Sequence, residues 1–519
     1  MKQWAAVFVA AVLVGCAGSE DGERPAPAEP APIRAGAPAS RFRLKGLEVS
    51  RRFTDESMGS VSCTPDGRLI ATGGGAIGVW DTVSGKQLWP KGLERGLGGT
   101  VLFSPDGTLL AVAGGSPRVA VRDPRTAELK ASSKSDAARQ CLAFSPDGRL
   151  LATMVRDAGS GLCSSVQITD VTTSADVLLI PTAHDPTVGA VAFSPDGTRL
   201  ATGGLDGCVR LWDPATGGLF LTIPTDLRAT LLAWSPDGRF LAANGLKEGV
   251  VIADAVAGAV VSRIRMKDGV WSLAFSPRGD LLAAGHGRNN ISLWDWTTGR
   301  LEMEGVDPEK RVFSAVTAMQ FMADGKRLVT ADANCAVIWD LRFDSRDPAP
   351  VSRTDQEMEA AWAALAGTDA PAAFAAMKSL ADVPEAGDFL RRRLLAPPAP
   401  PGAAIHDAIR DLGSEDPAAR ERATSVLAAD YLSARGAVRE ALAGATDPES
   451  RGRLEHLVAL LEGPRTPSSP DLLRRSRAVW ILEHLGNAEA RDALKLLEKE
   501  SPLERERKEA KEALARKLK

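Results

Sequence analysis

The sequence lacks the short motifs that mark several common classes of metal, redox, hydrolytic and nucleotide-binding site. Six of the 519 residues are cysteine, and no two of them are spaced C-x-x-C, which argues against a zinc or redox centre. There is no G-x-S-x-G nucleophile motif and no G-x-x-x-x-G-K-[ST] phosphate loop. The net charge is only −3, from 63 basic and 66 acidic residues, so no basic surface for nucleic acid is expected. We therefore expect no cofactor, no metal and no catalytic residue.

What is present is the composition of a soluble globular protein, with 44% apolar and 25% charged residues. The chain is too long for one ordinary domain. Its aromatic residues are unusual, because there is one tyrosine against 11 tryptophans. Several of these tryptophans recur in register, as described below.

Residues 1–16 are predicted to be a lipoprotein signal peptide. The apolar run from Trp4 to Val14 is too short to span a bilayer as a mature helix. It ends in Leu13-Val14-Gly15-Cys16, which resembles the bacterial lipobox, and this resemblance implies that the Cys16 sulfur carries diacylglycerol. The alternative is an ordinary secretory peptide whose cleavage site happens to contain a cysteine. Residues 17–41 are rich in Pro and Ala and predict a tether. We expect an exported protein, lipid-anchored to the inner or outer membrane on the periplasmic side.

Seven copies of one turn phrase follow. Their final glycines are 40, 41, 49, 41, 41 and 46 residues apart, and the copies are CTPDG (63–67), FSPDG (103–107), FSPDG (144–148), FSPDG (193–197), WSPDG (234–238), FSPRG (275–279) and FMADG (321–325). Each is followed by an aspartate in a shared setting, at VWD (79–81), VRD (121–123), ITD (168–170), LWD (211–213), IAD (252–254), LWD (293–295) and IWD (338–340). A period of this length predicts a repeat architecture.

One unit reads as a small antiparallel sheet. An apolar strand ends in a type I turn, in which Pro presets φ and Gly takes the left-handed position. A second strand of small residues and a third alternating strand follow, and a less regular fourth strand leads into the next unit. One such sheet cannot bury both of its faces alone, so the units must stack radially.

The array resembles the WD40 repeat family over about residues 42–342. The best unit is the fourth, "HDPTVGAVAFSPDGTRLATGGLDGCVRLWDPATG". The resemblance implies a structural tetrad of hydrogen-bonded side chains formed by His184, Thr202, Asp206 and Trp212. Other units depart from it: Ala333 and Arg288 stand where the aspartate should be, and units 2, 3 and 5 lack the tryptophan. The expected fold is a seven-bladed WD40 β-propeller, and the segment 42–53 is expected to complete the last blade and close the ring.

From residue 355 to 519 the apolar period changes from two to 3.6, which predicts an α-helical domain. Breaks at Pro384, 396–402 and 463–470 divide it into short helices. These look like HEAT-type hairpins, and the arrangement resembles helical tails that follow WD40 arrays in planctomycete-type bacterial proteins. Cys208 and Cys335 share one repeat position, four residues before a tryptophan, and are predicted to be small buried residues.

The function that these features favour is a non-catalytic scaffold that binds protein or peptide partners. Candidate partner-binding residues lie on one rim of the predicted ring, namely Trp271, Arg118, Arg156 and Arg288. The bland interpretation of Trp271 is packing against a neighbouring blade. The alternative function is a propeller-based enzyme of quinoprotein or hydrolase type, because "DTVSGKQLW" (81–89) is similar to the docking motif of quinoprotein blades. Only the first unit carries that tryptophan.

Overall fold

The structure is a computed structural model. It describes residues 44–518 apart from 55–57, 75, 90–98, 115, 133–138, 157–161, 183, 246–248, 267, 288–289, 307–314, 334, 344–351, 397–400, 415, 430, 447 and 463–469. The predicted signal peptide, the lipidation site Cys16 and the tether at 17–41 lie outside the described residues.

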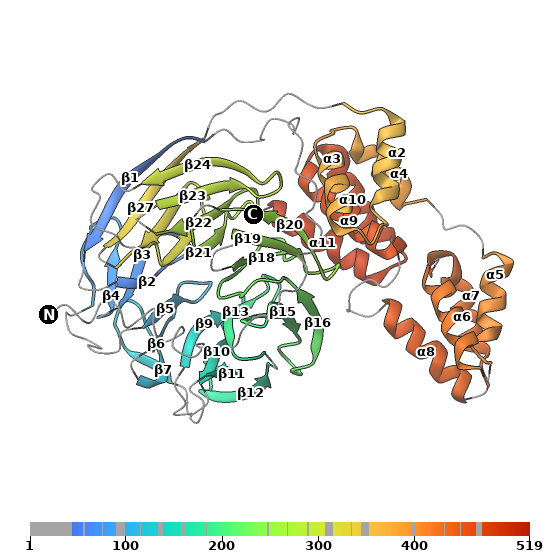
Figure 1. The fold of residues 1–519 in the computed structure, drawn as a ribbon, viewed down its shortest axis with the longest axis horizontal. Coiled ribbons are helices and arrows are strands. Elements are labelled where there is room, and N and C mark those ends of the chain that lie inside the picture. Colours follow the sequence, from blue (N-terminus) through green and yellow to red (C-terminus); the bar gives the residue numbers. More distant parts are fainter. Residues whose placement is uncertain are drawn as a thin grey trace, which may run out of the picture. The chain divides into compact units, whose positions relative to one another are not determined.

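Seven antiparallel sheets form the N-terminal part, and each contains one copy of the turn phrase (Figure 1). Blade 1 consists of β2 (Met58–Cys63), β3 (Leu69–Gly74) and β4 (Gly78–Asp81). Blade 2 consists of β5 (Thr100–Phe103), β6 (Leu110–Gly114), β7 (Ser116–Arg122) and β8 (Leu129–Ser132). Blade 3 consists of β9 (Arg139–Phe144), β10 (Leu150–Arg156), β11 (Cys163–Asp170) and β12 (Ala175–Pro181). Blades 4 and 5 consist of β13 (Val188–Phe193), β14 (Leu200–Gly204), β15 (Cys208–Trp212) and β16 (Leu219–Pro224); and β17 (Leu232–Trp234), β18 (Phe240–Gly245), β19 (Gly249–Asp254) and β20 (Ala259–Ile264). Blades 6 and 7 consist of β21 (Val270–Phe275), β22 (Leu282–His286), β23 (Asn290–Asp295) and β24 (Arg300–Val306); and β25 (Ala318–Phe321), β26 (Arg327–Ala331), β27 (Cys335–Phe343) and β1 (Leu44–Thr54).

Strand order in the sheets defines two rims of the ring. Because neighbouring strands are antiparallel, the first and third connections of a blade lie on one side, and the second connection and the link to the next blade lie on the other. We call the first side the turn rim; in blade 4 it comprises residues 194–199 and 213–218. The second side is the loop rim, which in blade 4 comprises residues 182–187 and 205–207.

The turn phrase recurs because it caps its own backbone. In blade 2 the Ser104 hydroxyl donates to the Asp106 carboxylate at 2.5 Å and accepts the Leu109 amide proton at 2.9 Å. The glycine that ends the phrase has a positive φ in all seven copies, for example +72° at Gly107, where a Cβ would be strained. The phrase is therefore a local device that needs no distant partner, which explains why it can recur around the ring, although blade 6 has Arg278 in place of the aspartate and blade 7 has Met322 in place of the serine.

The recurrent W-D aspartate has a similar role at the second turn. In six blades its carboxylate accepts a hydrogen bond from the backbone N–H of the residue two positions later in the chain. These six aspartates are Asp81, Asp123, Asp170, Asp213, Asp254 and Asp295. The seventh, Asp340, lies inside β27, because there the chain does not turn back. The left-handed position of this turn is glycine in most blades but is Ala127 in blade 2 and Ser174 in blade 3, with φ of +64° and +56°.

The N-terminal strand closes the ring, as the sequence predicts. β1 pairs antiparallel with β27 from Leu44↔Phe343 to Thr54↔Cys335, so the sheet order of blade 7 is β1-β27-β26-β25. Phe53 is buried against blade 1, and its ring centroid lies 5.7 Å from that of Trp80. Cys208 and Cys335 are half-buried rather than buried, because each begins a third strand next to the loop rim.

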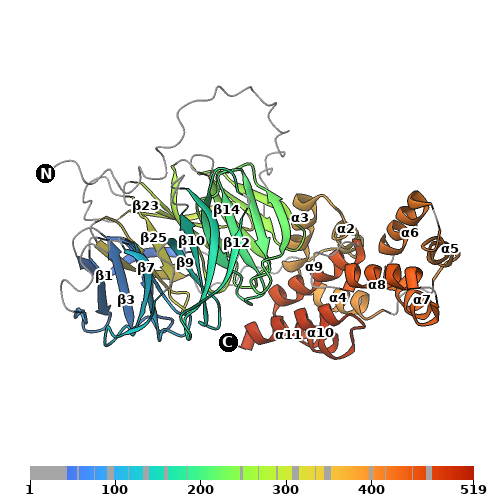
Figure 2. The same cartoon turned by 90° about the horizontal axis from the view of Figure 1, so that it is seen from below.

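Ten helices follow in the described C-terminal residues: α2 (Asp355–Ala364), α3 (Ala370–Ala381), α4 (Ala386–Leu394), α5 (Ala403–Asp411), α6 (Pro417–Ala429), α7 (Tyr431–Gly444), α8 (Pro448–Glu462), α9 (Pro470–Leu485), α10 (Ala488–Glu500) and α11 (Glu504–Leu518). The predicted helical domain is confirmed, but its packing departs from a HEAT stack, in which each repeat contacts only its sequence neighbours. Helix α9 contacts α3 and α4 as well as α10 and α11. Helices α5 to α8 pack around a second apolar core, to which Leu472 of α9 and Leu503 also contribute (Figure 2). No helix among the described residues is long and apolar enough to cross a membrane.

Candidate functional site

The four residues of the predicted tetrad meet inside blade 4. The His184 Nδ1 lies 2.9 Å from the Asp206 carboxylate, and its Nε2 lies 2.8 Å from the Thr202 hydroxyl. The Trp212 indole N–H donates to the same hydroxyl at 2.9 Å. Arg210, which lies in β15 four residues after Asp206, donates to the other Asp206 oxygen at 2.6 Å. The chain of bonds thus links the two loop-rim segments to the second and third strands.

The directions of these bonds follow from protonation. Burial lowers the pKa of His184 below its ordinary value of 6.5, although the bond to Asp206 opposes this. Burial raises the pKa of Asp206, but hydrogen bonds from Arg210 and His184 outweigh it and hold that pKa below its usual value. With an ionised carboxylate beside Nδ1, neutral His184 is assigned as the donor there and Nε2 as the acceptor of the Thr202 proton, although the Arg210 guanidinium, which can only donate, also contacts Nδ1. The Thr202 oxygen is left to accept from Trp212.

The same order of groups, carboxylate–histidine–hydroxyl, is found in catalytic triads, but burial argues against catalysis here. Thr202 has no exposed surface and its oxygen already accepts the indole proton. A nucleophile must reach its substrate. We therefore assign the four residues a structural role.

Replacing Asp206 with alanine is expected to lower the free energy of unfolding by about 1–3 kcal/mol, because the buried His184 N–H loses its acceptor. Asp332 of blade 7 stands one position before the residue that aligns with Asp206. Asp332→Ala should lower the free energy of unfolding by less than Asp206→Ala does. Asp332 accepts the Cys335 amide proton at 2.8 Å, and the sequence of that blade contains no histidine to hold. Urea denaturation of both variants measures the difference. Equal losses would show that the tetrad does not stabilise blade 4 as a unit.

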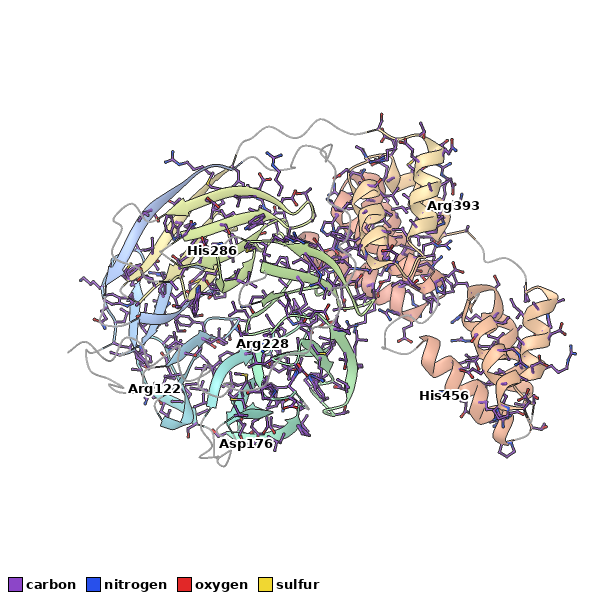
Figure 3. The ribbon with its side chains drawn as sticks, in the orientation of Figure 1. Arg122, Asp176, Arg228, His286, Arg393 and His456 are labelled. Atoms are coloured by element: carbon purple, nitrogen blue, oxygen red, sulfur yellow. The ribbon has the colours of Figure 1, made fainter. Side chains whose placement is uncertain are left out.

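Blade 6 contains a related arrangement that the sequence comparison of blades does not reveal. His286, at the end of β22 (Figure 3), has its Nε2 2.7 Å from the Ser292 hydroxyl. The Trp294 indole N–H donates to that hydroxyl at 2.7 Å. In blade 4 the hydroxyl belongs to Thr202 on the second strand, paired with Arg210 on the third. In blade 6 the equivalent pair is Ala284 with Ser292, so the hydroxyl has moved to the opposite strand.

The position of the histidine has moved as well. His286 stands where blade 4 has Gly204, at the end of the second strand. A Cβ at Gly204 would collide with the His184 ring and with Asp206. The two arrangements are therefore mutually exclusive within one blade. The turn phrase of blade 6 is rearranged in the same way: Arg278 replaces the aspartate, and Ser276 donates instead to Asp280.

Both buried histidines make stability depend on pH. Burial lowers the pKa of His286, as it does that of His184, although the Gly269 carbonyl opposes the change. The unfolded chain therefore takes up these protons first as the pH falls below about 6.5. Their stabilisation is complete above that pH and declines toward the lower folded pKa. The raised pKa values of Asp280 and Glu512 act in the opposite direction, because in the folded chain these carboxyl groups keep their protons to a higher pH than in the unfolded chain.

The expected result is a lower urea midpoint at pH 5.5 than at pH 7.5. His184→Gln should reduce this difference between the two midpoints, whatever it does to the midpoint at pH 7.5, because glutamine does not titrate. A difference that is unchanged in that variant would contradict the assignment.

The helical domain docks on the turn rim of blades 5 and 6 through an aromatic cluster. Phe240 lies after the turn of blade 5, and its ring centroid is 5.0 Å from Trp296, 5.4 Å from Phe374 and 5.6 Å from Trp480. Trp296 belongs to the second turn of blade 6, Phe374 to α3 and Trp480 to α9. All four are buried in one apolar core that joins the two domains.

A buried ion pair lies beside this cluster. Arg239 donates to Asp254 at 2.9 Å and to the Ser476 carbonyl of α9 at 3.0 Å, and both charged side chains are almost fully buried. The equivalent pair in blade 3, Arg149–Asp170, has a similar contact of 2.8 Å, but its arginine is 65% exposed. The helical domain therefore covers an arginine whose counterpart in blade 3 faces water, whereas the aspartate is buried in both pairs.

A cavity of about 110 Å³ lies between the turns of blades 4 and 5 and helices α9 and α11. Many of its charged lining groups are bonded to neighbours. Arg516 holds Glu483 at 2.7 and 2.8 Å, Arg505 holds Glu509 at 2.8 Å, and the Trp480 indole donates to Asp237 at 2.7 Å. Among the described residues, no group of acids, cysteines or histidines is arranged to hold a metal ion.

Comparison with known families agrees with this geometry. The model of the family "WD domain, G-beta repeat" matches residues 176–213 and 261–295, which cover the end of blade 3, all but the last strand of blade 4, and the corresponding part of blade 6. The chain carries WD40 repeats. The two matched segments end at Asp213 and Asp295, each directly after the tryptophan of a His–hydroxyl–Trp chain. No curated protein matched the chain in sequence.

Three of the four predicted partner-binding residues, Trp271, Arg118 and Arg156, belong to strand ends next to the loop rim of the WD40 propeller. Trp271 is the second residue of β21 and is 38% exposed, whereas the other tryptophans among the described residues are buried or half-buried. The backbones of Arg118 and Arg156 lie in β7 and β10, at the ends next to the loop rim. The side chains of Arg118 and Arg156, and all of Arg288, lie outside the described residues.

Trp89, the residue behind the quinoprotein resemblance, is buried between blades 1 and 2 of the WD40 propeller. Its indole N–H donates to the Pro124 carbonyl at 2.7 Å. That contact ties the outer part of blade 1 to the second turn of blade 2. This packing role explains why a tryptophan stands at position 89, and the explanation requires no cofactor.

Proposed function

We propose that the chain is a non-catalytic protein–protein interaction scaffold, anchored by a lipid at Cys16 to the bacterial cell envelope. The observation that carries the binding role is the contrast between the two rims. The turn rim of blades 5 and 6 is covered by the chain's own helices, whereas the loop rim leaves the Trp271 indole exposed. Exposed aromatic side chains commonly provide much of the binding energy at protein interfaces.

The enzyme alternative has less support. The triad-like groups of blade 4 are buried, and Trp89 is used in packing. The charged cavity between the domains is narrow and its groups bind one another. We therefore infer a scaffold that binds protein or peptide partners and uses no cofactor.

The test of the binding role starts from a chain without its signal peptide, used as bait, with partners identified by mass spectrometry. Trp271→Ala should then weaken the binding of the purified partner at least about tenfold, or by about 1.4 kcal/mol. The melting temperature should not change, since the side chain is exposed. The matched control is Val83→Ala, which removes a 75% exposed residue from the turn rim of blade 1.

If Trp271, Arg118, Arg156 and Arg288 all tolerate alanine without loss of binding, the loop rim is not the binding surface. Binding of a quinone, or turnover of a dye-linked substrate by the purified protein, would replace the scaffold proposal with the enzyme one.

The anchor has its own test. The native protein should partition into the detergent phase and incorporate labelled palmitate, and Cys16→Ala should abolish both. Label that persists in this variant would contradict lipidation at Cys16.

A further inference from the structure

The exposed Trp271 stands at an irregular point of its sheet. The ladder between β21 and β22 skips this residue, which is therefore one extra residue of β21 relative to its partner strand. A bulge of this kind changes the direction of the side chain that it carries. Blades 1 and 4 have an extra residue at the same point of their first strands, and in both blades it is a glycine, Gly59 and Gly189. Blade 6 differs from these two in presenting a large aromatic side chain there.

Asn244, at the end of β18 in blade 5, holds the peptide group that precedes Trp271. Its Nδ2 donates to the Val270 carbonyl at 3.2 Å and to the Thr230 hydroxyl at 3.1 Å. Its Oδ1 accepts the backbone N–H groups of Thr230 and Leu231 at 3.0 and 2.8 Å, which fixes which end of the amide is the oxygen. An asparagine side chain has two protons to donate and two lone pairs with which to accept, and all four are used here.

The position of Asn244 is small or apolar in the rest of the ring. The equivalent residues of the other six blades are Gly73, Ala113, Met154, Gly203, Gly285 and Ala331. A Cβ on any of the three glycines would lie within 2.9 Å of a carbonyl oxygen at the entry to the next blade, so there the entry lies directly on the sheet. In blade 5 the asparagine side chain, which has no exposed surface, lies between the two and hydrogen-bonds the entry instead. A buried polar side chain with every group paired fixes one geometry, which an apolar residue would not do.

Two further contacts hold the same segment. The His286 Nδ1 lies 3.4 Å from the Gly269 carbonyl, and the Ser272 hydroxyl donates to the Val316 carbonyl at the entry to blade 7 at 2.7 Å. The side chains of His286 and Ser272 are both buried. The backbone on each side of the exposed indole is therefore fixed by buried polar groups that belong to three successive blades.

We propose that Asn244 and His286 are positioning residues of the loop-rim binding site. They fix the two carbonyl groups that precede Trp271, so that the indole stands in its binding orientation before a partner arrives. A group that is already ordered loses less conformational entropy on association. The proposal rests on the scaffold function, which makes Trp271 a binding residue, and adds the buried residues that set its position.

The test is fluorine NMR of the chain without its signal peptide, labelled with fluorotryptophan. The Trp271 resonance is the one that disappears in Trp271→Phe. It should be a single line in the unsubstituted chain, and it should shift or split in Asn244→Ala and in His286→Gln. Asn244→Asp keeps an oxygen acceptor for the blade 5 backbone but loses both donated bonds, so it should have the same effect and replaces Asn244→Ala if that variant does not fold.

The matched control is His184→Gln, which breaks a buried network in blade 4, where the bulge carries only Gly189. This variant should lower the free energy of unfolding and leave the Trp271 resonance unchanged. With the partner purified as described above, Asn244→Asp should raise the apparent Kd at least about threefold, because the apparent Kd rises as the binding-competent fraction falls. His184→Gln should not change the Kd.

Two results would overturn the proposal. An unchanged Trp271 resonance in the Asn244 and His286 variants would mean that other contacts hold the indole. An equal change in His184→Gln would mean that the resonance reports a general loosening of the ring. The scaffold function fails separately, if Trp271→Ala leaves partner binding intact, because the fluorine experiment needs no partner.

Discussion

Replacing Arg239 with methionine is expected to lower the free energy of unfolding by about 3–5 kcal/mol, because it leaves the Asp254 carboxylate buried without its partner. Methionine keeps most of the side-chain volume, so the loss reports the charge rather than a cavity. The 6% and 1% exposed side chains of this pair leave little access for water to replace the missing guanidinium. The contact from Arg239 to the Ser476 carbonyl is lost as well, which should loosen α9 from the propeller.

The repeat supplies a matched control. Arg149→Met removes the equivalent contact in blade 3, where the arginine is 65% exposed and water can take its place beside the buried Asp170, and should cost no more than about 1 kcal/mol. Urea denaturation measures both values, and hydrogen exchange in α9 should rise only in the Arg239 variant. Similar losses at the two positions would mean that the helical domain does not bury the pair.

The blade count and the ring closure could be predicted because both depend on local signals. The Ser104-type turn and the W-D aspartate hydrogen-bond to their own backbone at fixed offsets, so their residue types and spacing persist from blade to blade. The last blade lacks a fourth strand of its own, and the N-terminal strand precedes the first blade without a partner. Pairing these two ends of the array is therefore the one way to complete the last sheet. The tetrad of blade 4 could be predicted for the same reason, since its four residues occupy the family's positions.

The arrangement in blade 6 could not be predicted by aligning the blades. Alignment places Ala284 and Arg288 at the positions of Thr202 and Asp206, which suggests that the network is lost. In the structure the hydroxyl comes from Ser292, across the strand pair, and the histidine from His286. A pairing rule that compares residues facing each other on adjacent strands, rather than residues at one position, would have found it.

Docking of the helical domain was also beyond the sequence pattern, although a signal was present. Phe240 directly follows a turn, at a position where the other blades carry leucine or arginine, and Trp296 lies within a turn, where the other blades carry the smaller Thr82, Pro124, Val171, Pro214 and Ala255. Large apolar residues at turn positions indicate that another element covers them. The pattern does not say which element, because the contacting residues Phe374 of α3 and Trp480 of α9 lie 106 residues apart in the chain.

Deletion of β1, residues 44–54, is expected to have the largest effect on the propeller. The deletion removes the nine paired residues that connect β27 to the N-terminal end of the chain, and it takes Phe53 out of the core between blades 7 and 1. Loss of a buried phenylalanine side chain alone costs about 3–5 kcal/mol. The exposed edge of β27 should in addition promote aggregation.

The control is deletion of residues 17–40, the predicted tether, from a chain that begins at residue 17. This truncation should change the free energy of unfolding by less than about 0.5 kcal/mol, if the segment carries no contacts that stabilise the fold. Phe53→Ala, which keeps the strand, separates the loss of the side chain from the loss of the ladder and should fall between the two truncations. Melting temperatures and light scattering measure all three. If the two truncations melt alike, the ring is held together without its N-terminal strand.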